Sequence, residues 1–95
     1  MSLRFEWDPR KATTNQRKHG VSFEEALSVF ADPLARIFPD EEHSVDEPRE
    51  IIIGHSARHQ IILVNFTGSD NHVRIFSARK ATRRERKDYE ENIGS

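Results

Sequence analysis

The apolar positions change along the chain from an alternating pattern to helical spacing and then to continuous runs. Residues 3–7 alternate apolar and charged side chains, which is the period of a half-buried strand. Asp8 followed by Pro9 is a favourable helix start, because aspartate accepts a free backbone N–H and proline costs nothing at the first helical position. These positions predict a first strand and then a polar helix that ends near His19.

Residues 20–31 carry the clearest helical pattern. Gly20 suits the left-handed position that ends a helix, and Ser22 with Glu25 three residues later matches a capping box for a second helix. The apolar stripe of this second helix, with spacing i, i+3, i+4 and i+7, consists of Phe23, Ala26, Leu27 and Phe30. Because proline disfavours helical geometry in the residue before it, Asp32-Pro33 ends the helix. We expect the stripe to face the core.

The second half of the chain predicts strands, whose expected ranges are 35–38, 51–53, 61–64 and 73–77. The last three are joined by short polar turns, and connections this short favour an antiparallel meander. Thr82 with Glu85 three residues on is a second capping box, which predicts a C-terminal helix to about Asn92.

The predicted order is therefore β-α-α-β-β-β-β-α, within one domain that spans residues 1–95. This order predicts an α+β fold in which a curved antiparallel β-sheet carries two N-terminal helices and one C-terminal helix. We expect the helices to cover a single face of the sheet, with one core between the two layers. The other face would then be polar or would meet a partner.

Length and composition agree with one small core. The chain has 95 residues, of which 35% are hydrophobic and 33% charged. It contains no cysteine, which excludes a disulfide scaffold and thiolate chemistry. The longest apolar run, residues 61–64, is far shorter than the roughly 20 residues that span a bilayer. Because the charged N-terminus also lacks the apolar stretch of a secretory signal, we expect a cytoplasmic protein without a membrane partner.

The distribution of charge changes the meaning of the formal net charge of −1, which by itself argues against a nucleic-acid partner. Basic residues gather in one segment, at Arg74, Arg79, Lys80, Arg83, Arg84, Arg86 and Lys87. Acidic residues gather in another, at Asp40, Glu41, Glu42, Asp46, Glu47 and Glu50. The basic segment is either a solvated helix face or an anion-binding surface, and both interpretations stay open here.

Strand alternation in residues 73–77 directs Arg74 and Phe76 to one face of the sheet and Val73 to the other. Strict alternation would place Arg79 with Val73, so Arg74 and Arg79 share a face only if the strand ends or bulges between them. A concave face with both arginines, bordered by a basic helix, would bind a phosphate backbone. The alternative is that the arginines pair with the acidic segment.

Two groups of residues resemble BrnT-type toxins. The N-terminal group is Trp7-Asp8, Lys11, Asn15, Lys18-His19-Gly20-Val21, Phe23, Ala26 and Asp32-Pro33. The C-terminal group is Arg49, Gly54, Thr67, residues 74–82, Glu85 and Tyr89. The resemblance covers residues 5–90, and Arg-Ile-x-Ser-Ala-Arg-x-Ala-Thr is its most specific part. Phe76 departs from the aliphatic residue that family members often have, and residues 56–59 are not matched.

The resemblance implies the toxin of a type II toxin–antitoxin pair, a small ribonuclease with a RelE-like α+β fold that arrests translation. Its implied partners are an RNA substrate and a ribbon-helix-helix antitoxin of the BrnA type. Operator DNA would be contacted only through the toxin–antitoxin complex, which would repress its own promoter.

Metal-independent RNA cleavage needs a group that activates the 2′-hydroxyl, a proton for the leaving 5′-oxygen and positive charge at the phosphate. The catalytic candidates are Lys18, His19, Arg74, Arg79 and Glu85. His19 is either an acid or base near neutral pH or a cap at the helix C-terminus, and Lys18 is a phosphate or surface contact. Arg74 and Arg79 suit phosphate because guanidinium groups donate hydrogen bonds in pairs. Glu85 is either a general base or the third residue of the capping box.

Lys80, Arg83 and Arg84 are the predicted RNA contacts, because they continue the basic segment into the start of the last helix. No cofactor or metal site is predicted, since HExxH is absent and His55 and His59 fall in a hairpin connection rather than on one helical face. The alternative function is a non-catalytic module that binds RNA or a protein through the same basic patch.

Overall fold

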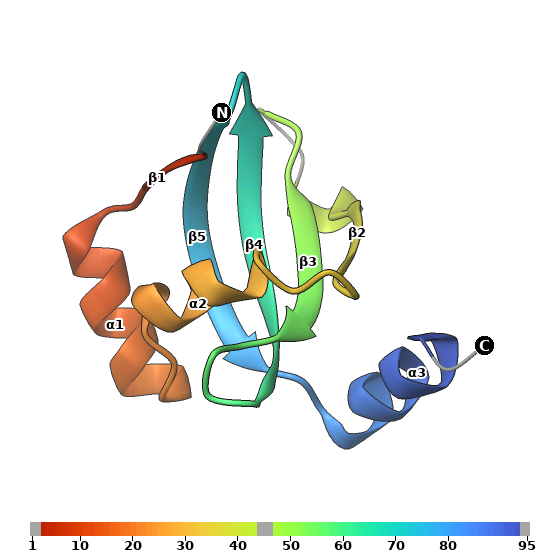
Figure 1. The fold of residues 1–95 in the computed structure, drawn as a ribbon. Coiled ribbons are helices and arrows are strands. Elements are labelled where there is room, and N and C mark those ends of the chain that lie inside the picture. The colour runs from red at the N-terminus through yellow and green to blue at the C-terminus, as the bar shows by residue number, and fades with distance from the viewer. Residues whose placement is uncertain (1–2, 44–46, 94–95) are drawn as a thin grey trace.

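The computed structural model describes residues 3–43 and 47–93 and has the predicted order of elements. The first half contains β1 (Arg4–Glu6), α1 (Pro9–His19), α2 (Phe23–Val29), β2 (Arg36–Pro39) and a 3-10 helical turn at Glu41–His43. The second half contains β3 (Glu50–His55), β4 (Ile61–Ser69), β5 (His72–Lys80) and α3 (Arg83–Ile93), as Figure 1 shows. Within the described residues, no helix has the length and apolar character needed to cross a membrane.

The helix ends have the caps that the sequence predicts. The Asp8 carboxylate accepts the N–H of Arg10 at 2.8 Å, and α1 ends at Gly20 with a left-handed φ of 70°. The Ser22 hydroxyl accepts the N–H of Glu25 at 3.0 Å at the start of α2. Local side-chain chemistry therefore determines where both N-terminal helices begin and where the first one ends.

The sheet has five strands in the order β1-β5-β4-β3-β2. Strands β2 to β5 form the antiparallel meander that the short connections predict. Strand β1 adds to the edge of β5 in parallel, with Phe5 opposite Val73, so the sheet is mixed. This pairing joins the first strand of the chain to the last, and no local pattern indicated it because its partners are far apart in sequence.

The main core lies between one face of the sheet and the helices α1 and α2. It includes the predicted apolar stripe of α2, and Val21, Phe23, Ala26 and Val29 are completely buried. Edge-to-face ring contacts link it across the layers, with Phe30 at 5.2 Å from Phe5 and 5.0 Å from Phe66 between ring centroids.

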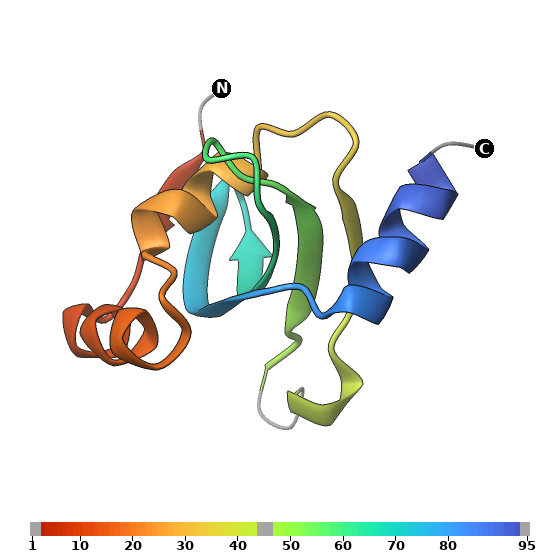
Figure 2. The same cartoon turned by 90° about the horizontal axis from the view of Figure 1, so that it is seen from below.

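Helix α3 lies against the opposite face of the sheet, so the expectation that all helices cover one face is wrong (Figure 2). Tyr89 of α3 is 3% exposed and packs with Ile53 and Leu63. The physical reason is the continuous apolar character of β3 and β4, because alternate side chains of such strands point away from the main core and need a cover of their own.

A β-bulge interrupts the pairing of β4 with β5. Asn65 pairs with Ser77 and Phe66 pairs with Ile75, which leaves Phe76 as the extra residue of β5. After the bulge Ala78 again faces the main core, as Val73 and Ile75 do before it. Arg74 and Arg79 therefore lie on the same face, which is the condition that the sequence left open.

The side chain of Asn15 secures β5 directly after the bulge. Its Nδ2 donates to the carbonyl oxygens of Ala78 at 2.8 Å and Val21 at 2.9 Å, and its Oδ1 accepts the N–H of Ala78 at 3.0 Å. Asn15 is 5% exposed, so these bonds form away from water. Because β1 pairs only with the first part of β5, the amide takes the place of a neighbouring strand at Ala78.

Asp32, which follows α2 on one face of the sheet, is bonded to α3 on the other face. Its Oδ2 accepts the backbone N–H of His55 at 2.7 Å and the hydroxyl of Tyr89 at 3.1 Å. A Cβ on Gly54 would lie 2.9 Å from the same oxygen, which explains why glycine occupies that position. The carboxylate thus connects the end of α2, the end of β3 and α3.

We predict that Asn15→Ala lowers the free energy of unfolding by about 1–3 kcal/mol, because both backbone groups of Ala78 lose a partner in a buried place. Urea denaturation of the two proteins measures the difference. Gln16→Ala is the matched control, since Gln16 is exposed on the same helix. Equal stability of Asn15→Ala and Gln16→Ala would contradict this role of the amide.

Candidate functional site

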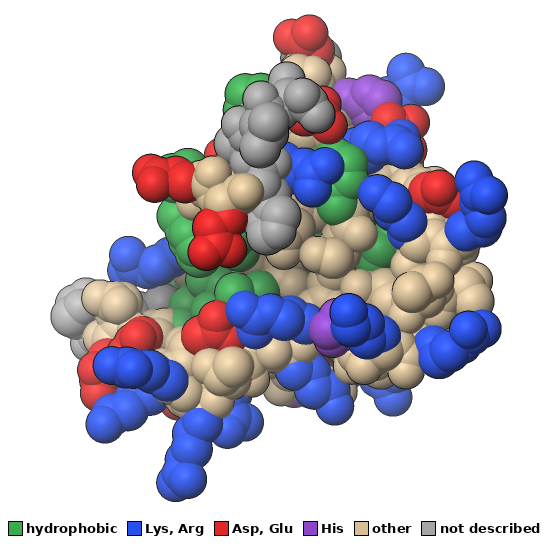
Figure 3. Space-filling model, turned by 180° about the vertical axis from the view of Figure 1, so that it is seen from behind, with side chains coloured by type: hydrophobic (Ala, Val, Ile, Leu, Met, Phe, Trp, Pro, Cys, Tyr) green, Lys and Arg blue, Asp and Glu red, His purple; other side chains and the backbone are tan. Residues whose placement is uncertain are grey.

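The open sheet face is the part of the sheet that points away from the main core and that α3 leaves uncovered. Its residues on β4 and β5 are Asn65, Thr67, Arg74, Ser77 and Arg79. Figure 3 looks onto this face and shows lysine and arginine side chains around a hollowed centre. The face therefore combines polar groups with a positive rim, which suits a phosphate backbone.

A chain of hydrogen bonds forms the polar centre of the open sheet face. The Ser77 hydroxyl donates to Oδ1 of Asn65 at 3.2 Å, and Nδ2 of Asn65 donates to Asp40 at 2.5 Å. Asp40 is 6% exposed, so this residue of the acidic segment is buried against the sheet and does not belong to a solvated loop. Asp46 of the same segment lies outside the described residues.

Arg74 lies at the end of the open sheet face that adjoins β1. Its Nη1 is 3.3 Å from Oε1 of Glu6, and the ring of His72 contacts the same oxygen at 3.2 Å. The side chains of Arg74 and Glu6 are 43% and 45% exposed. Exposed ion pairs contribute only about 0–1 kcal/mol, so a phosphate group can replace Glu6 as the partner of Arg74 at little cost.

Arg79 lies at the other end of the open sheet face and forms a two-pronged ion pair with Glu85. The two guanidinium nitrogens are 2.8 and 2.9 Å from the two carboxylate oxygens. Glu85 also completes the predicted capping box, accepting the N–H of Thr82 at 2.8 Å. Among the described residues, Arg74 and Arg79 thus pair with Glu6 and Glu85 rather than with the acidic segment.

The bond from Arg79 lowers the pKa of the Glu85 carboxyl from 4.5 to about 2. The same bond raises the pKa of Arg79. A carboxylate with so low a pKa accepts a proton poorly near neutral pH. Of the two interpretations that the sequence offered for Glu85, the geometry therefore favours the structural one, in which it caps α3 and orients Arg79.

Lys18 and His19 lie in the last turn of α1, away from Glu85. They line a groove of about 360 Å³ beside β5, which we name the α1–β5 groove and to which Lys11, Phe76 and Ser77 also contribute. Lys18 is exposed and His19 is half-buried. An imidazole and two ammonium groups therefore lie beside the bulged part of β5, at Phe76 and Ser77.

Phe76 connects the α1–β5 groove with the open sheet face. The guanidinium carbon of Arg49 lies 4.0 Å from the centroid of its ring, and the ammonium nitrogen of Lys11 lies 5.3 Å from it. Arg49 and Lys11 were not among the predicted site residues. The only sequence signal for them was their place in the family resemblance, because neither lies in the basic segment.

The catalytic candidates on β5 and α1 thus lie around the bulge of β5. Arg74 and Arg79 flank the bulge on one face, while Lys18 and His19 approach the same bulge from α1. Of the predicted RNA contacts, Arg83 and Arg84 are exposed on the first turn of α3, and Lys80 lines a different hollow, between the β3–β4 hairpin and α3. In residues 3–43 and 47–93, no three histidine, aspartate or glutamate side chains gather as metal ligands would.

A family model and a solved structure that are similar to this chain carry the same family name. The family model described as "Ribonuclease toxin, BrnT, of type II toxin-antitoxin system" matches residues 7–85. The crystal structure of the Brucella abortus ribonuclease toxin BrnT, at 1.1 Å resolution, is similar with a TM-score of 0.62 and 30% sequence identity. The alignment covers 86% of this chain and 100% of the Brucella chain. No curated protein sequence matches this chain.

We predict that Glu85→Gln lowers stability at neutral pH and that this difference disappears in acid. Because the folded pKa of Glu85 lies below its ordinary value, the contribution of the Arg79–Glu85 pair is complete above about pH 4.5 and is lost as the pH falls through about 2. Urea midpoints of both proteins across this range measure the difference.

The control for this measurement is Glu91→Gln, which removes an exposed carboxylate from the same helix. Its difference from the unmodified protein should stay small throughout. A stability difference for Glu85→Gln that persists at the acid end would mean that the ion pair is not its source.

Proposed function

Because this chain belongs to the BrnT family of ribonuclease toxins of type II toxin–antitoxin systems, we propose that it cleaves RNA at the bulge of β5 without a metal ion. The reaction is attack of a ribose 2′-hydroxyl on the adjacent phosphate. The observation that carries this proposal is the bulge itself, which brings Arg74 and Arg79 to one face beside the groove that holds Lys18 and His19.

The RNA backbone lies along the open sheet face in this proposal. Arg74 exchanges Glu6 for a phosphate oxygen, and Arg79 keeps Glu85 on one side while its half-exposed guanidinium contacts the phosphate. Lys80, Arg83 and Arg84 extend the positive surface towards α3 for neighbouring phosphates. Their exposure supports contact with a long anionic substrate.

The chemistry assigned to the groove is proton transfer. The 2′-hydroxyl gives its proton to the neutral imidazole of His19, and the 2′-oxygen forms a bond to phosphorus. The bond from phosphorus to the 5′-oxygen then breaks, and that oxygen takes a proton from solvent. Arg74 and Arg79 stabilise the negative charge of the phosphate in the transition state, with Lys18 as a further contact. The products are a 2′,3′-cyclic phosphate and a 5′-hydroxyl.

A protein partner is also part of the proposal, namely a ribbon-helix-helix antitoxin of the BrnA type. The edge strand β2 and the residues before it supply support, because Leu34, Ile37 and Phe38 are 52%, 55% and 42% exposed. Apolar side chains gathered at a sheet edge are typical of protein-binding surfaces. In this view the toxin acts on RNA in the cytoplasm and stops translation, and it meets operator DNA only through the antitoxin complex.

We predict that the purified protein cuts total cellular RNA in the presence of EDTA and leaves 2′,3′-cyclic phosphate ends. The mechanism requires a free 2′-hydroxyl, so a 2′-O-methyl oligoribonucleotide should stay intact and serves as the control. Gel analysis with end-group mapping measures both results. Salt-dependent RNA binding with no product would instead favour the non-catalytic binding module.

We predict that Arg79→Ala lowers kcat/KM for RNA by about 10²–10³-fold, the range found when a transition-state donor is removed. Because Arg79 also holds Glu85, Glu85→Gln separates the two roles: it breaks the ion pair but keeps the guanidinium, so it should lose much less activity. Arg58→Ala, at the exposed hairpin tip, is the control for charge alone. Equal losses in Arg79→Ala and Glu85→Gln would make Arg79 a structural residue.

A further inference from the structure

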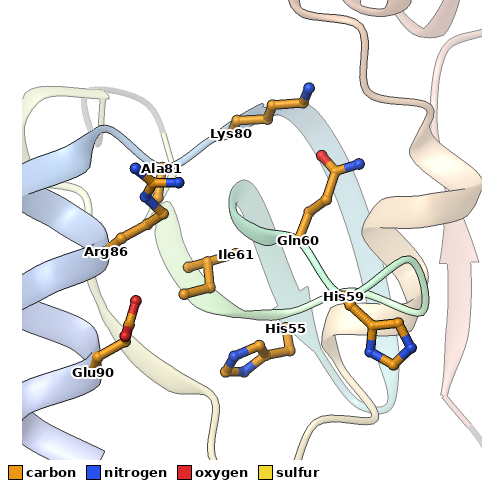
Figure 4. Close-up of a pocket in the computed structure, with 8 residues that line it drawn as sticks. All are labelled: His55, His59, Gln60, Ile61, Lys80, Ala81, Arg86 and Glu90. Atoms are coloured by element: carbon orange, nitrogen blue, oxygen red, sulfur yellow. The ribbon is translucent and has the colours of Figure 1, made fainter.

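A second hollow lies at the end of the sheet, outside the site described above. It has a volume of about 770 Å³ and lies between the β3–β4 hairpin and α3 (Figure 4). We name it the hairpin pocket; the polar and charged side chains that line it are His55, His59, Gln60, Lys80, Arg86 and Glu90. A pocket of this size matches a nucleotide or another small ligand.

The ring of His55 is held in a defined orientation in the wall of the hairpin pocket. Its Nδ1 lies 3.3 Å from Oδ2 of Asp32, and its ring lies 5.5 Å from the ring of Tyr89. Backbone and side-chain bonds, including the one from Tyr89, lower the pKa of Asp32, so this carboxylate stays charged. The carboxylate favours the proton on Nδ1, which leaves Nε2 of the 40% exposed side chain for a ligand.

The charge of the hairpin pocket is positive by one unit with neutral histidines. Lys80 and Arg86 are exposed and form no ion pair among the described residues, while Glu90 is the single carboxylate in the lining. Arg86 and Glu90 are four residues apart on α3, and Figure 4 shows both side chains on the side of the helix that faces the pocket. The pocket therefore offers two cations to an anion, with one carboxylate that weakens the attraction.

The amide of Gln60 adds a group without a partner. Its Oε1 is buried and accepts no hydrogen bond from residues 3–43 or 47–93, although the side chain lines the hairpin pocket. Buried polar atoms are normally satisfied. A ligand that brings a donor, such as a ribose hydroxyl or a base N–H, would satisfy the amide after a small rotation of the side chain. Cations and an unsatisfied acceptor together fit a nucleotide better than a simple anion.

We propose that the hairpin pocket binds one nucleotide of the RNA, next to the segment held on the open sheet face. The choice of RNA as the source of this nucleotide rests on the proposed function. Lys80 directly follows Arg79 in β5 and points to the opposite side of the strand end. A backbone that contacts Arg79 can therefore pass around the end of β5 to Lys80 and Arg86, with Gln60 and His55 at the ribose or base.

The experiment measures binding of a 2′-O-methyl oligoribonucleotide, which the proposed reaction cannot cut, by fluorescence anisotropy at several salt concentrations. Arg86→Gln should weaken binding several-fold and reduce the salt dependence by about 0.7 in the slope of log K against log salt. Glu90→Gln should tighten binding, since it removes the one carboxylate among the described residues that line the pocket. Lys87→Gln is the matched control, because Lys87 has the same kind of charge on α3 but does not line the pocket.

Equal effects of Arg86→Gln and Lys87→Gln, or weaker binding of Glu90→Gln, would overturn the pocket proposal. Cleavage of natural RNA by the unmodified protein is measured beside the binding. A protein that cuts RNA but shows no difference between the two variants disproves the nucleotide pocket alone. A protein that cuts no RNA disproves the proposed function, whatever the variants bind. His55→Phe, which keeps a ring beside Tyr89 and the backbone N–H that bonds to Asp32, should weaken binding while the protein still unfolds in a single cooperative transition.

Discussion

The buried amide of Asn15 is the interaction on which the arrangement of the site depends. It bonds to both backbone groups of Ala78 and also to the carbonyl of Val21, so one side chain holds α1, the turn after it and β5 together. Ala78 lies just after the bulge, at the part of β5 that β1 does not reach. Without a partner there, the strand edge would need water or another strand, and the register beyond the bulge would lose its support.

The bulge, together with this local support, decides which side chains share the open sheet face. One extra residue, Phe76, changes the direction of every side chain that follows it in β5. Arg79 therefore joins Arg74 on the open sheet face, and Phe76 itself becomes a surface on which the side chains of Arg49 and Lys11 rest. Charges from α1, from Arg49 just before β3 and from β5 meet at this point, although they lie far apart in the sequence.

Acidic side chains near the open sheet face and the hairpin pocket differ in how firmly they are bonded to their partners. Glu85 is tied to Arg79 by two short bonds and to the start of α3 by its capping box, so it acts as part of the frame. Glu6 contacts Arg74 only at the exposed surface, where water screens the pair. Asp32 is a second frame residue, because it connects α2, β3 and α3 and also orients His55 at the hairpin pocket. Glu85 and Asp32 thus hold neighbouring elements together, while Arg74 on the open sheet face stays accessible to a ligand.

The sequence by itself determined the elements, their order and the family, because caps, apolar periods and the motif around Arg79 are all local signals. It also predicted the candidate site residues, in the basic segment and at the end of α1. Only the tertiary structure decided which residues share a face, since a bulge, the β1–β5 pairing and the position of α3 depend on contacts between distant segments. The same limit applies to Glu85: its spacing from Thr82 predicted the capping box, but its ion pair with Arg79 depends on a guanidinium that only the folded chain brings to it.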